Sequence, residues 1–266
     1  MNATTAVATA TRSNSRRLLI ASILSALALL ALWFIGRSVL PYLELSQAHY
    51  GPYFWPRRWG LVLHVAGGVI ALTAGVVQLW LGLTNRVAAL HRVLGKVYVG
   101  VIVVASIAGF YLSLTIPGNA PYAAGLFFLC VAWVVTTSMA VLAIRRRNLL
   151  QHREWMMRSY AVTFAFVTFR FGVDALASSG VATSDAQAIM AWACWAIPLL
   201  LLEPLVQLRR CISSTRSCIS GVNSSPKSSG PKNGRSSILA SSPEIGGGTR
   251  CAHSSASSID FTSQSQ

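Results

Sequence analysis

Long apolar stretches alternate with short polar segments along most of the chain. Six of these stretches cover residues 18–40, 60–82, 93–115, 122–144, 154–175 and 186–208. A helix needs about 20 mostly apolar residues to cross the hydrocarbon core of a bilayer, so each stretch is long enough to span a membrane. The pattern therefore predicts an all-α fold, a polytopic membrane bundle of six transmembrane helices.

The two ends of the chain differ from this middle part. The first apolar stretch follows Arg12, Arg16 and Arg17, but it is longer than the ~7–15 residues usual for the core of a signal peptide. We expect residues 1–17 to be a cytoplasmic segment, 18–40 an uncleaved anchor helix and 60–208 a helical membrane domain. Over 211–266, Ser makes up 18 of 56 residues and hydrophobic periodicity is lost, which predicts a disordered cytoplasmic tail.

The positions of the basic residues predict the orientation. Lys and Arg outnumber Asp and Glu by 22 to 7, yet they lie between apolar stretches rather than along a polar helix face, so we expect no nucleic acid partner. Positively charged turns stay in the cytoplasm, and four basic groups fall on one side of the predicted bundle. We expect a multi-pass protein of the cell membrane with both termini cytoplasmic, in contact with the bilayer and its anionic headgroups; the oligomeric state stays open.

Polar residues inside the apolar stretches recur at helical spacing. In the second stretch His64 and Gln78 are separated by small residues at intervals of three or four, which lets neighbouring helices approach closely. We expect helices two to five to form a four-helix core flanked by helices one and six. Polar residues divide into an outer layer of His64, Arg170 and Asp174 and a cytoplasmic layer of Gln78, His91, Tyr98, His152, Arg158 and Glu203.

Three motifs in this order carry a family resemblance. They are His64-Val65-Ala66-Gly67-Gly68 continuing to Gln78, His91-Arg92-x-x-Gly95-x-x-Tyr98, and His152-Arg153-Glu154-Trp155-Met156 continuing to Arg170. Together, over about 60–208, they resemble an uncharacterised bacterial family of predicted membrane proteins, domain of unknown function 2306. The resemblance implies a multi-helix integral membrane protein with no established activity, and we expect this protein in the bacterial inner membrane.

The two His-Arg pairs suggest a cofactor. His91 and His152 each stand where a basic turn meets an apolar helix, so both imidazoles are expected at the cytoplasmic face. Paired axial imidazoles in a helical bundle are a recurrent way to hold haem iron. We therefore consider haem b bound by His91 and His152 for electron transfer, with Arg92, Arg153 and Tyr98 around the ligands.

Two other functions fit the same sequence. A small-solute or proton transporter would use the intramembrane residues His64, Gln78, Arg170, Asp174 and Glu203, because ionisable groups inside a membrane are candidates for function. The structural interpretation is that Arg170 pairs with Asp174 and that Glu203 pairs with an arginine. A non-catalytic protein would bind lipids or support assembly through its basic turns. Hydrolase motifs are absent from the sequence, and the question of an enzymatic activity and its catalytic residues stays open.

Overall fold

The computed structural model describes residues 3–84 and 87–223, and all long elements in these ranges are helices. The long helices are α1 (Ala3–Phe34), α3 (Arg58–Thr84), α4 (Ala88–Leu114), α5 (Ala120–Arg145), α6 (Leu149–Ser178) and α7 (Thr183–Asn223). Each contains a stretch long and apolar enough to cross a membrane, six in all in the described chain. The predicted all-α bundle of six membrane helices is confirmed, and the chain is a multi-pass membrane protein.

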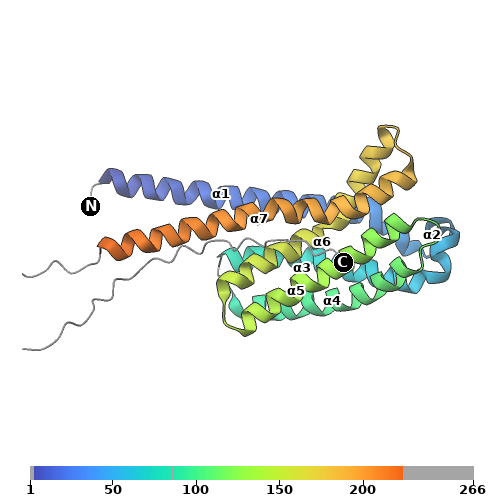
Figure 1. The fold of residues 1–266 in the computed structure, drawn as a ribbon, viewed down its shortest axis with the longest axis horizontal. Helices are drawn as coiled ribbons and strands as arrows, with labels where there is room; N and C mark the ends of the chain where they lie inside the picture. The colour runs from blue at the N-terminus through green and yellow to red at the C-terminus, as the bar shows by residue number, and fades with distance from the viewer. Residues whose placement is uncertain (1–2, 85–86, 224–266) are drawn as a thin grey trace, which may run out of the picture. The chain divides into compact units, whose positions relative to one another are not determined.

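A short irregular segment joins α1 to α3. It consists of a π-helical turn (Ile35–Val39), a 3₁₀ helix (Leu40–Glu44), the short helix α2 (Gln47–Phe54) and a 3₁₀ turn (Trp55–Arg57). Gly51 adopts a φ of 66° inside α2, a left-handed conformation that glycine tolerates best. The segment places aromatic residues at the end of the bundle where α2 lies (Figure 1).

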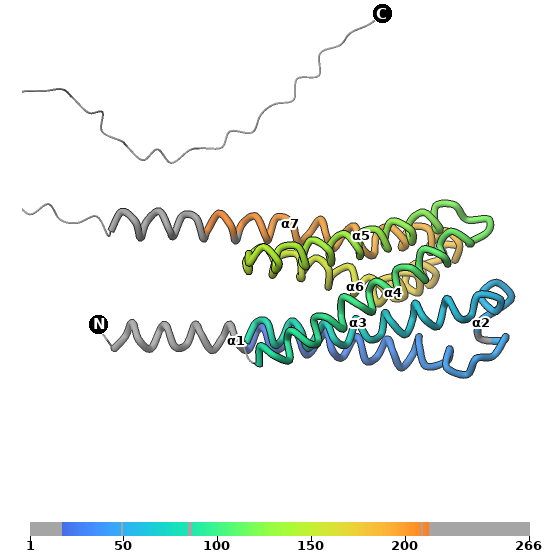
Figure 2. Tube along the Cα trace, turned by 90° about the horizontal axis from the view of Figure 1, so that it is seen from below, coloured from blue at the N-terminus to red at the C-terminus, as the bar shows by residue number. Residues whose placement is uncertain are grey.

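Helices α3 to α6 form the core of the bundle. The turns after α3 and α5 make two antiparallel hairpins, α4 packs against α5, and α3 packs against α6. These contacts place the four helices in a square in which α4 and α6 are diagonal partners. Figure 2 shows α1 beside α3 and α7 beside α5 and α6. The predicted four-helix core with two flanking helices is thus confirmed.

Small residues on α3 allow its close approach to the neighbouring helices. An added Cβ at Gly67 would lie 2.8 Å from the Cβ of Ala105 on α4, and one at Gly75 would overlap the ring of Tyr160 on α6. Side chains from all four helices fill the middle of the core, with Leu72, Tyr98, Trp133 and Val162 each 1 % exposed or less. The core is therefore closely packed across its centre.

Several boundaries differ from the predicted ones. Helices α4 and α6 begin about five residues earlier than the apolar stretches, and Asn148 caps α6 by accepting a hydrogen bond from the Gln151 amide at 3.0 Å. Helix α7 continues to Asn223, into the sequence predicted as a disordered tail. The rest of that predicted tail, 224–266, lies outside the described residues.

Candidate functional site

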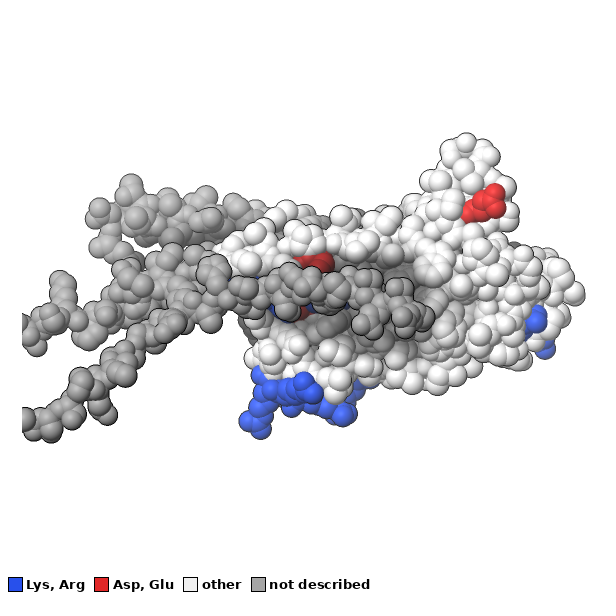
Figure 3. Space-filling model, viewed as in Figure 1, with Lys and Arg blue, Asp and Glu red and all other residues white. Residues whose placement is uncertain are grey.

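The end of the bundle that holds the α3–α4 and α5–α6 turns is its basic end. Exposed cationic side chains gather there, among them Arg92, Lys96, Arg145 and Arg153, and Figure 3 shows a cluster of Lys and Arg at this end. The opposite end, which holds α2 and the turns after α4 and α6, is called the far end. The candidate residues of the sequence divide between these two ends.

His91 and His152 occupy equivalent places at the basic end. Both lie in the first turn of a helix, because the His91 amide donates to Val87 O at 3.1 Å and the His152 amide donates to Asn148 O at 2.9 Å. Their helices, α4 and α6, are diagonal partners in the core, and both residues lie at the basic end. The structure therefore places the two histidines that the sequence singled out at the same end of the bundle, in the first turns of two core helices.

The His152 ring is held by a neighbouring helix. Its Nδ1 lies 2.9 Å from the carbonyl oxygen of Ala140 on α5. A carbonyl only accepts, so Nδ1 carries the hydrogen and, in the neutral ring, Nε2 keeps a lone pair. A backbone bond at one ring nitrogen that orients the other is typical of metal-ligating histidines.

The His91 ring has a different environment. Its Cε1 would lie 3.5 Å from a Cβ added at Gly82, so a glycine on α3 makes room beside the ring. The backbone oxygen of His91 accepts a hydrogen bond from Gln78 Nε2 at 2.7 Å. The Nδ1 of His91 is buried and has no hydrogen-bond partner in the described part of the chain. The ring therefore has an unused polar nitrogen, which is rare for a buried group.

Two ion pairs join α6 to α7 near this end. Arg158 donates to Glu203 at 2.5 Å, and Glu154 accepts two hydrogen bonds from Arg210. Glu154 and Arg158 are both buried, and the Arg158 guanidinium also lies over the Trp155 ring at 4.8 Å from its centroid. The interpretation that Glu203 pairs with an arginine is confirmed, and both pairs fix α7 against the core.

A cluster of hydroxyl groups fills the centre of the core, and it was not recognised from the sequence. Tyr98 bonds Ser159 at 3.0 Å and Thr163 at 2.8 Å, Ser159 bonds Thr137 at 2.8 Å, and Trp133 Nε1 donates to Thr163 at 2.8 Å. All five residues are buried. The Tyr98 hydroxyl is thus engaged with α6, in the middle of the bundle, rather than with the two histidines.

The polar residues of the far end are more dispersed than predicted. His64 and Arg170 line the same cavity, but Arg170 and Asp174 are exposed on α6. The last turns of α6 continue with α7 as a hairpin beyond the core (Figure 1). Within the described residues no ion pair joins Arg170 to Asp174, and Arg170 instead donates to the Tyr42 hydroxyl at 3.4 Å. The predicted pairing of Arg170 with Asp174 is therefore wrong, because Tyr42 of the irregular segment reaches the guanidinium.

The profile of a family described as predicted membrane protein (DUF2306) matches residues 61–206, more than half of the chain. The chain belongs to this family. No curated protein matches the chain, and no solved structure does.

The DUF2306 region holds most of the features described above. It includes the three intramembrane histidines, the hydroxyl cluster and the Arg158–Glu203 pair, while Tyr42 and Arg210 lie outside it. The described residues contain no cluster of three or more His, Cys, Asp or Glu side chains that could hold a metal ion. Haem iron needs only two protein ligands, fewer than the three or more that such a cluster would supply.

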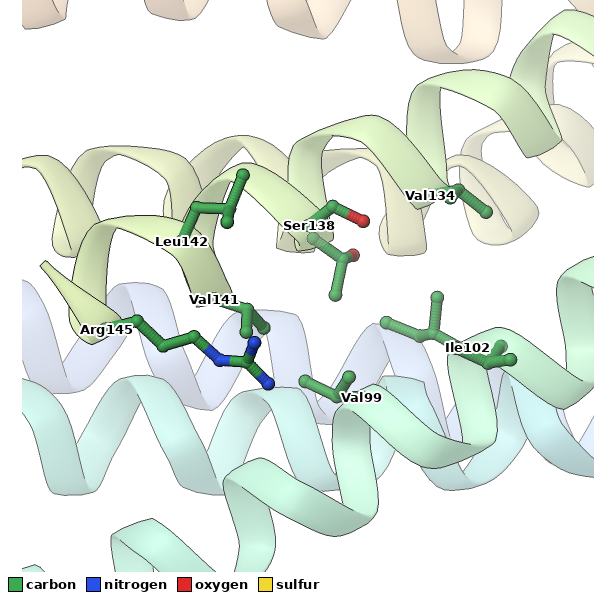
Figure 4. Close-up of a pocket in the computed structure, with 9 residues that line it drawn as sticks. Val99, Ile102, Val134, Ser138, Val141, Leu142 and Arg145 are labelled. Carbon is green, nitrogen blue, oxygen red and sulfur yellow. The ribbon is translucent and has the colours of Figure 1, made fainter.

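This DUF2306 protein also carries an apolar groove between α4 and α5. The groove has a volume of about 280 Å³ and is lined mostly by valine, isoleucine and leucine side chains. Arg145 lies at its end, and in Figure 4 the arginine side chain extends along the groove toward Val141 and Val99. The groove thus combines an apolar trough with a cation at the basic end.

Proposed function

We propose that this protein binds haem b at the basic end, with His91 and His152 as the two axial ligands, and transfers electrons within the membrane. The observation that supports the proposal is the equivalent place of the two histidines, each in the first turn of a core helix at the basic end. Haem is a one-electron carrier whose redox properties depend on its axial ligands and their surroundings.

The two rings suit the role of ligands in different ways. The Ala140 carbonyl holds His152 Nδ1 and leaves Nε2 with its lone pair. His91 has a buried nitrogen that no described neighbour bonds, so its ring is not committed to another hydrogen bond. Gly82 leaves space beside it. Both imidazoles are therefore available to a shared ligand.

The charges at the basic end suit the carboxylates of a haem. Arg92 and Arg153 directly follow the two histidines and are exposed. Guanidinium groups form strong charge-assisted hydrogen bonds with carboxylates, and we assign these arginines to the propionates. Tyr98 would lie farther inside, where its hydroxyl cluster forms a packed floor below the site.

The orientation follows from the same charges. Basic turns are retained in the cytoplasm, so we place the basic end and both termini in the cytoplasm and the protein in a bacterial inner membrane. Electrons would then be exchanged on the cytoplasmic side. The variant Arg147→Cys, in the α5–α6 turn, tests this orientation. A membrane-impermeant thiol reagent should label position 147 only after the cells are opened.

The transport alternative receives less support from the packing. Any route between the far end and the basic end would pass the centre of the core, where Trp133 and Tyr98 are almost fully buried and bonded to Thr163. The lipid-binding alternative is favoured by one observation, the groove that ends at Arg145. An acyl chain in the trough would place an anionic headgroup near this arginine. Arg145→Gln should then lower the amount of anionic lipid that copurifies, while Arg147→Gln serves as the control.

The test of haem binding is the visible spectrum of the full chain purified from haem-sufficient cells. We expect a Soret band and a sharp band on reduction in the wild type, and loss of both in His91→Ala and in His152→Ala. His64→Ala is the matched control, because it removes a histidine from the far end. A colourless wild type would refute the proposal, as would a band that survives both substitutions in protein that is monodisperse on size exclusion.

A further inference from the structure

The far end contains a cavity of about 390 Å³ that the proposed haem site does not use. This volume lies within the range typical of small-molecule sites. The walls are aliphatic and aromatic side chains from the irregular segment and from most of the helices, including Phe54, Tyr122, Trp133, Phe166 and Phe169. A ligand that fits such walls is itself largely apolar and carries an aromatic ring.

His64 provides a polar group inside these walls. Its Nδ1 lies 2.8 Å from the Ala105 carbonyl of α4, so Nδ1 carries the hydrogen and Nε2 of the neutral ring is an acceptor. The ring also contacts Phe166, with 5.2 Å between the ring centroids. On the other side, a Cβ at Gly109 would come within 2.9 Å of His64 Nδ1. The imidazole is therefore held in one orientation, with an acceptor that suits a hydroxyl group.

Arg170 provides a second polar group of opposite character. It also lines the cavity and follows Phe166 by four residues of α6, about 6 Å along the helix axis. Its guanidinium only donates, and it already contacts the Tyr42 hydroxyl. The cavity thus offers both a hydrogen-bond acceptor and a hydrogen-bond donor.

We propose that this cavity binds a lipid-soluble quinol, with one ring hydroxyl donating to His64 Nε2 and the opposite oxygen accepting from Arg170. A quinol has an aromatic ring, hydroxyls at both ends and an apolar tail, which match the aliphatic and aromatic walls and the two polar groups of the cavity. The oxidised quinone lacks the hydroxyl hydrogen that His64 accepts. Binding should therefore favour the quinol over the quinone.

The test is calorimetric titration of the full chain in nanodiscs, under anaerobic conditions, with a decyl-tailed benzoquinol and with the matching benzoquinone. We expect the quinol to bind about tenfold more tightly than the quinone, which corresponds to ~1.4 kcal/mol. His64→Phe should remove this preference, and His64→Gln, which keeps an acceptor, should retain part of it.

A second pair of variants tests the cavity itself. Gly68 lines the cavity and would make only ordinary contacts with a new Cβ, so Gly68→Leu should fill the space and abolish binding. Gly100→Leu is the control, because a Cβ at Gly100 meets no atom within 4 Å and the residue is exposed on α4. Wild-type protein that binds no quinol, equal binding of quinol and quinone, or unchanged binding in Gly68→Leu would each overturn the inference.

Haem binding and quinol binding are separable in this experiment. His91→Ala is predicted to lose haem and to keep the quinol site, whereas Gly68→Leu is predicted to lose quinol binding and to keep the haem spectrum. Titration of the His91→Ala protein therefore tests the quinol site even where the haem proposal fails. Loss of quinol binding in His91→Ala would contradict the far-end location.

Discussion

Removing the Thr163 hydroxyl is the sharpest test of the buried cluster. Thr163 Oγ1 accepts from Trp133 Nε1, lies 2.8 Å from the Tyr98 hydroxyl and donates to the Ser159 carbonyl at 2.9 Å. Because its single hydrogen goes to the carbonyl, the Tyr98 hydroxyl is the donor to Thr163. Thr163→Val keeps the shape of the side chain and removes the acceptor shared by Trp133 and Tyr98.

The cost of this change can be worked out from the partners that remain. After Thr163→Val the Tyr98 hydroxyl can still donate to Ser159, but the indole N–H of Trp133, in a residue 1 % exposed, has lost the acceptor assigned to it. An orphaned buried donor costs ~1–3 kcal/mol, and interhelical hydrogen bonds in membranes contribute ~0.6 kcal/mol on average. We expect Thr163→Val to lower the free energy of unfolding by about 2–3 kcal/mol.

Tyr98→Phe should cost less, about 1 kcal/mol, although it also removes two hydrogen bonds. Thr163 then still accepts from Trp133 and donates to the Ser159 carbonyl, and Ser159 can donate to Thr137. In this variant the indole N–H of Trp133 keeps its acceptor, and the Ser159 and Thr137 hydroxyls keep the hydrogen bond between them.

The assay is unfolding of the purified protein in mixed micelles by increasing SDS, followed by circular dichroism. Thr73→Val is the matched control, because Thr73 is exposed and its hydroxyl bonds carbonyls of its own helix. The double variant Trp133→Phe/Thr163→Val removes donor and acceptor together and should be less destabilised than the sum of the single changes. Equal effects of Thr163→Val and Thr73→Val would refute the reasoning.

Two further predictions concern contacts between helices. Glu203→Leu leaves the buried Arg158 without its partner and should cost about 1–2 kcal/mol, since the Glu203 side chain is half exposed; the swap Arg158→Glu/Glu203→Arg should recover part of this in the same SDS titration. Gly75→Val should cost at least ~1–3 kcal/mol, because any Cβ there overlaps the Tyr160 ring. The double variant Gly75→Val/Tyr160→Leu should restore the midpoint of the SDS titration. If its destabilisation instead equals the sum of the two single effects, the proposed steric cause is contradicted.

Hydropathy predicts the number of helices in this chain but not their ends. Six apolar stretches suffice to count the spans, because a bilayer imposes their length. The starts of α4 and α6 fall outside those stretches, in turns that carry His91 and the Asn148 cap. Apolar periodicity gives no signal for such polar first turns, although the Asn before an apolar run is a recognisable cap.

The two ends of the bundle also differ in how much of their arrangement can be predicted from the sequence. His91 and His152 lie at one end because equivalent hairpin turns place them there, a relation that charge and spacing reveal. The hydroxyl cluster depends on the rotation of α5 against α6, which brings Thr137 to Ser159. The far-end cavity depends on the irregular segment, whose Tyr42 takes the Arg170 contact that sequence spacing assigned to Asp174. Such contacts between distant segments leave no local pattern.

The most direct measurement of the central claim identifies the axial ligands of the proposed haem. Near-infrared magnetic circular dichroism of the oxidised wild-type protein should show a bis-imidazole low-spin centre, and His152→Met should convert it to the imidazole–thioether signature while haem content is retained. A wild-type protein without haem, or a bis-imidazole signal unchanged in His152→Met, would contradict the assignment of His91 and His152 as the ligand pair.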